Sequence, residues 1–118
     1  MLTSERIARA WLDAFNRGDV DALIALYAED ATHTSPKIRA LHPDTGGRLV
    51  GTAAIAAWWR DALRRLPGLR YDATTIVADD QRVIIEYDRH APGETPLPVA
   101  EAFDVRDGKV VASRVYHG

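Results

Sequence analysis

The sequence predicts an α+β fold in which three helices pack against one antiparallel sheet. Apolar residues recur at helical spacing only in the first 66 residues, and four extended segments separated by turn residues follow. Helices that precede a meander of strands are typical of domains in which the helices cover one face of the sheet. A chain of 118 residues is long enough for one hydrophobic core, so we expect a single domain over residues 1–118.

The first helix is expected to begin near Ser4 and to end before Gly18. Its apolar residues recur at helical spacing and form one strongly aromatic face: Ile7, Trp11, Ala14 and Phe15. Gly18 can adopt the left-handed backbone conformation that ends a helix, and Asp19 is a good N-cap for the next one. The apolar residues of this short second helix are Val20, Leu23, Ile24 and Tyr27.

A first strand is expected from Ala31 to Ser35, because Pro36 disfavours helical geometry in the residue before it. Residues 36–49 contain prolines and paired glycines, so we expect an irregular loop, of a length often found in lids. A third helix should begin after Gly51 and end before Pro67. Its wide apolar face comprises Ile55, Trp58, Trp59, Ala62, Leu63 and Leu66.

The rest of the chain has the pattern of four strands, expected at residues 71–77, 82–90, 99–106 and 110–117. Asp107-Gly108 between the last two is a strong hairpin signal. Residues 91–98 contain three prolines and are expected to form a connection.

Composition and motifs exclude several classes of function. The chain has no cysteine, which excludes disulfide bonds, cysteine-based zinc sites and thiol nucleophiles. Seventeen acidic and fifteen basic residues nearly balance, so the charge predicts no nucleic-acid partner. The four histidines are not at metal-ligand spacing, and the sequence has neither a Gly-rich phosphate loop nor a GxSxG motif. We therefore expect no metal and no cofactor.

Hydropathy bears on where the protein resides. No apolar stretch approaches the length of a membrane span. Glu5, Arg6 and Arg9 lie where a signal peptide needs an apolar run. We therefore expect a cytoplasmic protein with no membrane partner.

Strand parity singles out Glu101, because alternate residues of a strand face opposite sides of a sheet. Val99, Glu101, Phe103 and Val105 share one face, so one carboxyl group lies in an apolar row. If this row faces the helices, burial should raise the pKa of Glu101 and make it a candidate general acid or base. If the row faces outward or into an interface, Glu101 is merely solvated.

Two histidines are weaker candidates for proton transfer. Val111, Ser113, Val115 and His117 share a face of the last strand, and His117 can approach Glu101 only if their two rows lie on the same side. A histidine beside the C-terminal residue is more often at the surface. His33 and Ser35 also share one face of their strand. The alternative to a role in proton transfer is that both are polar residues on an exposed edge of the sheet.

The segment AFNRGDVDALIALYAEDATHTSP resembles the opening of the NTF2-like superfamily, in particular its SnoaL-like polyketide cyclase and ketosteroid isomerase branch. GTAAIAAWW and DVRDGKVVASRVYHG resemble later parts of these proteins in the same order. The resemblance implies a cone in which a strongly curved antiparallel sheet wraps three N-terminal helices and leaves a hydrophobic pocket at its open end. It also implies a homodimer formed through the sheet.

The resemblance can be carried over residue by residue. The catalytic Asp that precedes a Pro in the isomerases corresponds to Ser35, which cannot abstract a proton unaided. An Asp that its apolar site keeps protonated, as an oxyanion-hole donor, corresponds to Glu101. A pocket aromatic on the last strand corresponds to His117. The oxyanion-hole Tyr and two supporting Tyr correspond to Trp11, Tyr27 and Trp59.

The expected function is therefore proton transfer, as isomerisation or cyclisation, on a small apolar carbonyl or polycyclic compound. Glu101, His117 and His33 are the catalytic candidates. The candidates for substrate binding are Trp11, Phe15, Tyr27, Ser35, Trp59, Phe103 and Ser113, although helical spacing alone is equally satisfied by a packed core. The alternative is a non-catalytic ligand-binding or dimeric adaptor module. An epoxide-type hydrolase, which needs an Asp–Arg–Asp constellation, has only Glu101 with Arg89 or Arg114 to offer.

Overall fold

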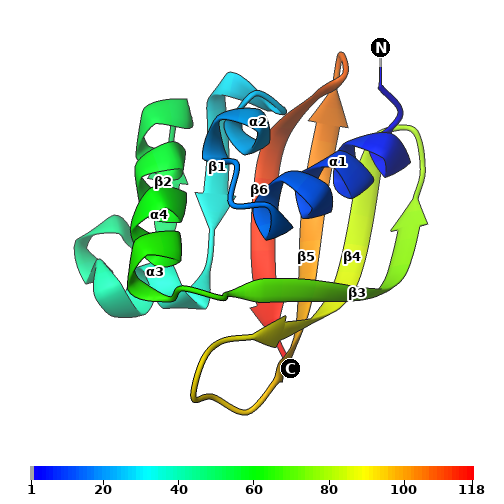
Figure 1. The fold of residues 1–118 in the computed structure, drawn as a ribbon. Coiled ribbons are helices and arrows are strands. Elements are labelled where there is room, and N and C mark those ends of the chain that lie inside the picture. Colours follow the sequence, from blue (N-terminus) through cyan, green and yellow to red (C-terminus); the bar gives the residue numbers. More distant parts are fainter. Residues whose placement is uncertain (1) are drawn as a thin grey trace.

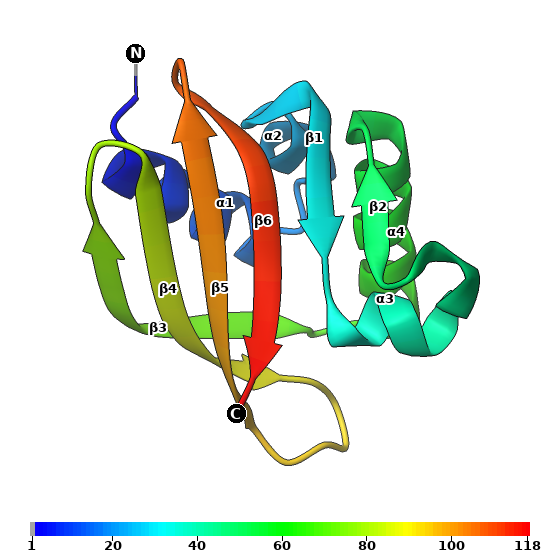
Figure 2. The same ribbon diagram turned by 180° about the vertical axis from the view of Figure 1, so that it is seen from behind.

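The computed structural model describes residues 2–118 and contains one six-stranded sheet with α1, α2 and α4 on one side of it (Figures 1 and 2). In chain order the elements are α1 (Ser4–Asn16), α2 (Val20–Ile24), β1 (Tyr27–Thr34), α3 (Pro36–Leu41), the 3-10 turn η1 (Pro43–Thr45), β2 (Arg48–Val50), α4 (Thr52–Arg65), β3 (Arg70–Ala78), β4 (Arg82–His90), β5 (Leu97–Arg106) and β6 (Lys109–His117). The predicted helices are confirmed as α1, α2 and α4, and the four predicted strands of the second half as β3 to β6. Among the described residues, no helix is long and apolar enough to cross a bilayer.

The breaks between the first helices follow local rules. The Thr3 side chain accepts a hydrogen bond from the backbone N–H of Arg6, and Asp19 accepts one from Ala22, so each N-cap satisfies a free N–H of its helix. Gly18 has φ of 70°, the left-handed conformation that glycine adopts without strain. These residues end α1 and start α2 where the sequence predicts.

Residues 36–49 are more ordered than the predicted loop. Ser35 N-caps the short helix α3, and Pro36 occupies its first turn, where a missing N–H costs nothing. The short strand β2 then pairs with β1. The predicted irregular loop is wrong here, because proline breaks a helix in its interior but is tolerated in its first turn. The first strand also begins earlier than predicted, at Tyr27.

The sheet has the strand order β2-β1-β6-β5-β4-β3. All neighbours are antiparallel except β1 and β6, which run parallel, so the sheet is mixed rather than wholly antiparallel. No tight hairpin joins β1 to β6, so a hairpin does not dictate their relative direction. A bulge between Ala73 and Thr75 interrupts the pairing of β3, which turns sharply in Figure 1 and gives the sheet its curvature.

The core lies between α1, α4 and the inner face of this curved sheet. A chain of stacked rings runs through it, with centroid separations of 5.5 Å for Trp11–Phe15, 4.0 Å for Phe15–Tyr71 and 4.2 Å for Tyr71–Tyr87. Burial of such large apolar rings helps to hold α1 on the sheet.

Strand parity holds along β5, where Val99, Glu101, Phe103 and Val105 are all buried. Parity fails at the start of β6. A bulge between Asp104 and Val105 shifts the register, so that Val110 is buried in place of the predicted Val111.

Candidate functional site

A cavity of about 270 Å³ lies at one end of the sheet, between α3, α4, the inner face of β3 to β6 and the connection after β4. Most of its wall is apolar or aromatic, and exposed residues such as Leu41, Glu94 and His117 form its rim. A few polar groups in a mostly apolar wall are the usual form of a small-molecule site, and the volume lies just below the usual range of about 300–1,000 Å³.

The structure divides the residues that the sequence singled out into two groups. His33, Ser35, Trp59 and His117 line the cavity. The others are buried beside it in the core: Trp11, Phe15, Tyr27, Glu101, Phe103 and Ser113. The aromatic residues of α1 therefore pack on the sheet, whereas the aromatic wall of the cavity comes from Trp58 and Trp59 of α4 and from Tyr71 and Tyr87.

A chain of buried hydrogen bonds leads from α1 to His33. Trp11 Nε1 donates to the hydroxyl oxygen of Tyr27 at 3.0 Å. The Tyr27 hydroxyl lies 3.3 Å from Ser113 Oγ, and Ser113 Oγ lies 2.6 Å from His33 Nδ1. Since an indole N–H can only donate, every group in the chain is satisfied when Tyr27 donates to Ser113 and Ser113 donates to His33.

This direction fixes the tautomer of His33. Its Nδ1 accepts a hydrogen bond, so the proton of the neutral ring is on Nε2, which has no hydrogen-bond partner among residues 2–118. Burial lowers the pKa of His33 to about 3, so the ring is neutral at physiological pH. His33 thus lines the cavity and carries one buried N–H donor, on Nε2, that has no hydrogen-bond partner in the described chain.

Glu101 is fully buried on the inward face of β5, which decides between the two interpretations of its row. The hydroxyl of Tyr87 donates to its Oε1 at 3.0 Å, and its Oε2 has no partner in the described chain. Burial raises the pKa of Glu101 to about 8, although the Tyr87 hydrogen bond opposes this rise. Because Tyr87 lines the cavity, Glu101 is separated from the cavity by one side chain.

His117 shares the inward face with Glu101 but is not its partner. In the β5–β6 register, His117 is opposite Val99 and Glu101 is opposite Val115. The hydrogen bond to Glu101 comes from Tyr87 instead. Burial lowers the pKa of His117, and the positive charges of Lys37 and Arg89 lower it further. His117 therefore belongs to the basic rim of the cavity.

Sequence reasoning missed Arg89 as a residue of the cavity wall, having named it only for the hydrolase alternative. Its side chain is 6% exposed and forms a 3.0 Å ion pair with Glu94. The buried residues of β4 alternate, as Val83, Ile85, Tyr87 and Arg89. The same parity that singled out Glu101 could therefore have identified both Tyr87 and Arg89 as inward-facing.

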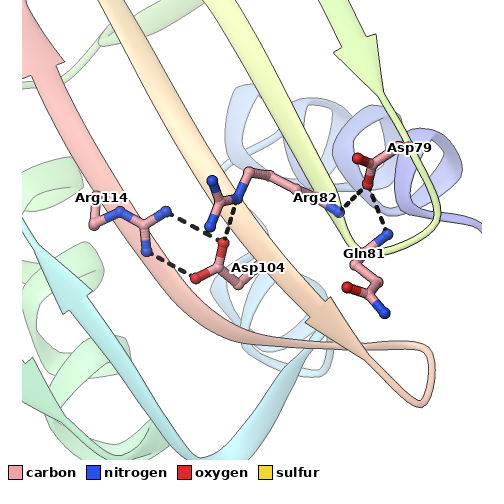
Figure 3. A network of polar contacts seen from close by, with 5 residues as sticks. All are labelled: Asp79, Gln81, Arg82, Asp104 and Arg114. Carbon is pink, nitrogen blue, oxygen red and sulfur yellow. Dashed lines mark hydrogen bonds and ion pairs between the residues drawn. The ribbon is translucent and has the colours of Figure 1, made fainter.

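Arg114 lies away from the cavity. It forms an ion pair with Asp104, which also pairs with Arg82, on the face of the sheet opposite the core (Figure 3). Beside this network, Asp79 accepts hydrogen bonds from the backbone N–H groups of Gln81 and Arg82 and closes the β3–β4 turn. The wall of the cavity holds Arg89 and one carboxylate, Glu94, rather than the two carboxylates of the hydrolase alternative. Within residues 2–118, no three His, Asp or Glu side chains are grouped to hold a metal ion.

Comparison with known proteins agrees with this fold. The family model of the SnoaL-like domain matches residues 8–113. Among curated proteins, no match to the chain is found. Among solved structures, a SnoaL-like protein of unknown function from Burkholderia thailandensis is 29% identical with a TM-score of 0.85, over 98% of this chain and 94% of that one.

Other solved structures share the fold at lower identity. A candidate polyketide cyclase from Sinorhizobium meliloti is 23% identical, with a TM-score of 0.77 and 94% of each chain covered. A protein from Catenulispora acidiphila with a ketosteroid isomerase-like fold, solved with trimethylamine, is 23% identical, with a TM-score of 0.75 over 97% of this chain and 86% of that one. Further neighbours are described as NTF2-like and cystatin-like, which confirms the predicted fold class. Because the family model spans most of its length, the chain belongs to the SnoaL-like domain family.

Proposed function

We propose that the protein binds a small, largely apolar carbonyl compound in this cavity and catalyses proton transfer at the carbon next to the carbonyl group. The observation that carries the proposal is the pair formed by Glu101 and Tyr87, in which a buried carboxyl group accepts a hydrogen bond from a tyrosine that lines the cavity. Isomerisation and cyclisation of such compounds both begin with this step.

His33 is the proposed donor to the carbonyl oxygen of the substrate. Removal of the neighbouring proton turns this oxygen into an enolate oxygen, and a hydrogen bond to the developing charge strengthens in a dry site. A neutral imidazole whose Nδ1 is held by Ser113 can donate from Nε2 without first losing a proton. His33 is thereby the oxyanion donor of the proposal.

Tyr87 and Glu101 are the proposed proton carriers. With Glu101 ionised, the Tyr87 oxygen can take the substrate proton while its own hydrogen passes to Glu101 Oε1. The electron pair of the broken C–H bond remains on the substrate as the enolate, and the protonated Glu101 returns a proton by the reverse path. A pKa of about 8 supports this role, because both protonation states are then populated near neutral pH.

The test is deuterium exchange. The ketone 2-tetralone is incubated with the protein in D₂O, and the loss of its α-proton signals is followed by NMR against the protein-free rate. We expect catalysed exchange in the wild type and its loss in Glu101→Gln and Tyr87→Phe. Glu86→Gln is the matched control, since Glu86 is exposed on the opposite face of β4. Exchange that survives Glu101→Gln in a folded protein contradicts the proposal.

One observation favours a second candidate, a non-catalytic ligand-binding module. Ser35 stands where the resemblance to the isomerases leads one to expect an aspartate. Its hydroxyl oxygen accepts a hydrogen bond from the backbone N–H of Lys37, and Ser35 is thereby the N-cap of α3. The cavity therefore lacks a directly placed base at this position. Binding of 2-tetralone in calorimetry without catalysed deuterium exchange would establish this alternative.

The predicted homodimer remains a proposal, formed through the outer face of the sheet that Figure 2 presents uncovered. Large apolar side chains are exposed along its strands, among them Val77 at 65%, Ile84 at 42% and Tyr116 at 56%. Burying such residues favours association. Sedimentation equilibrium should give a dimer for the wild type and a monomer for Ile84→Glu.

A further inference from the structure

The wall of the cavity is basic although the chain as a whole carries a net charge of −2. It contains the cationic side chains of Lys37, Arg65 and Arg89 and a single carboxylate, that of Glu94. Arg65 is already engaged, because it donates to Asp61 on the surface of α4 at 2.7 Å. Arg89 is paired with Glu94 inside the wall, so Lys37 is the cation of the wall that no carboxylate of the described residues balances.

Arg89 is the more informative of the two, because it is a buried cation with an exposed partner. Its side chain is 6% exposed, whereas that of Glu94 is 47% exposed. One hydrogen bond of 3.0 Å joins Arg89 Nη1 to Glu94 Oε1, from a segment between β4 and β5 that is exposed from residue 92 to residue 96. A buried guanidinium requires an anionic partner, and here a surface carboxylate reaches inward to supply it.

Lys37 and His117 lie at the same end of the cavity as Arg89. Lys37 forms no ion pair with the described residues, and it shares the cavity wall with the other two. In the register of the sheet, His117 is opposite Val99 and Arg89 is opposite Leu97, two residues away on β5, and the positive charges of Lys37 and Arg89 contribute to the lowered pKa of His117. Two cationic side chains and one imidazole are thus neighbours in the wall at this end of the cavity.

We propose that this end of the cavity binds the carboxylate of the ligand, so that the substrate is a small apolar acid with its hydrocarbon body against Trp58, Trp59 and Tyr71. The carboxylate of Glu94 occupies the position of the ligand carboxylate when the cavity is empty. The guanidinium fork matches a carboxylate in shape and charge, and Glu94 already demonstrates the contact. This inference deepens the proposed function and rests on it only for the placement of the ligand in this cavity.

The test is isothermal titration calorimetry with a matched pair of probes, 2-naphthoate and its neutral analogue 2-naphthamide. Arg89→Gln removes the guanidinium, Lys37→Gln removes the ammonium, and Glu94→Gln removes the competing carboxylate. Arg82→Gln is the control, because Arg82 is also on β4 and paired with a carboxylate, but on the outer face. The Lys37→Gln and Glu94→Gln variants keep the test decisive if Arg89→Gln does not fold.

We expect naphthoate to bind the wild type about tenfold or more tightly than naphthamide, the ratio that one charge-assisted hydrogen bond supplies. Arg89→Gln and Lys37→Gln should weaken naphthoate alone, Glu94→Gln should strengthen it, and Arg82→Gln should change neither probe. Equal binding of the two probes overturns this inference but leaves proton transfer in the cavity standing. Preferred binding of the acid, without catalysed exchange of 2-tetralone or of its carboxylated analogues, overturns the proposed reaction instead.

Discussion

The Tyr87 hydroxyl donates to Oε1 of Glu101 at 3.0 Å, and this contact joins a fully buried carboxyl group to the wall of the cavity. The two residues are on adjacent strands, with Tyr87 opposite Val99 and Glu101 opposite Ile85. They are therefore diagonal neighbours on the inner face, where long side chains can meet. The free energy of unfolding should report the titration of this pair.

The first prediction is that Glu101 and His33 shift the free energy of unfolding in opposite directions as pH changes. Burial raises the pKa of Glu101 from 4.5 to about 8, so between these values the native chain holds a proton that the unfolded chain has lost. Stability from this group falls there as pH rises. Burial lowers the pKa of His33 from 6.5 to about 3, so the unfolded chain holds the extra proton between these values and stability rises with pH.

The two effects oppose one another between pH 4.5 and 6.5, and that of Glu101 acts alone from 6.5 to about 8. Each has a limiting slope of about 1.4 kcal/mol per pH unit. Urea unfolding over this series of pH values should therefore show stability falling above pH 6.5 in the wild type. In Glu101→Gln the free energy of unfolding should rise with pH up to pH 6.5 and then stay level. A wild-type stability that is level between pH 6.5 and 8 would contradict the buried acid.

The second prediction concerns Tyr87→Phe. Its hydrogen bond to Glu101 stabilises the carboxylate form and opposes the rise in pKa, so its removal should raise the pKa of Glu101 further. The fall in stability should then extend to higher pH than in the wild type. ¹³C NMR of the Glu101 carboxyl group measures the same pKa directly. A pKa that moves downward in Tyr87→Phe would show that the hydroxyl is not the donor.

The alternation of β5 let the sequence predict the row that contains Glu101, because a period of two needs no knowledge of the partner strand. The contact between His33 and Ser113 was not predictable in this way. This contact joins residues 80 positions apart in the sequence, and it depends on the parallel pairing of β1 with β6. It also depends on the bulge near the start of β6, which changes the side of the sheet that the following residues of β6 face. Neither leaves a local signal.

The resemblance to ketosteroid isomerases predicted the cone-shaped fold, but it predicted the surroundings of individual side chains less well. Trp11 corresponds to an oxyanion-hole residue, yet its indole N–H is used by Tyr27 inside the core. Its ring stacks within the cluster that holds α1 on the sheet. A larger side chain at this position fills space that a phenol leaves open, and packing rather than chemistry decides where it points.

The third prediction is that His33 is the Nε2–H tautomer and that Ser113 keeps it so. ¹⁵N NMR of the imidazole should show a protonated Nε2 and an unprotonated Nδ1 at neutral pH in the wild type. Ser113→Ala leaves Nδ1 and the Tyr27 hydroxyl without their shared partner, and it should lower the free energy of unfolding by roughly 1–3 kcal/mol. Ser4→Ala serves as a control for the loss of a buried serine elsewhere. A wild-type ring protonated on Nδ1 would make His33 the donor to Ser113 and Ser113 the donor to Tyr27, while Trp11 would still donate to Tyr27.

The last prediction restores a base to the cavity. Ser35 lines the cavity and caps α3 through its side-chain oxygen, and aspartate caps a helix equally well. Ser35→Asp should therefore fold and place a carboxylate beside the proposed carbonyl site, with Lys37 near enough to favour its ionised form. General-base catalysis contributes about 10²-fold or more, so deuterium exchange of 2-tetralone should accelerate by this order over the wild type. Ser35→Asn is the matched control, because it keeps the cap and the shape but cannot accept the proton. If the two variants are both folded by circular dichroism and exchange equally fast, the carbonyl group of the ligand does not bind beside Ser35.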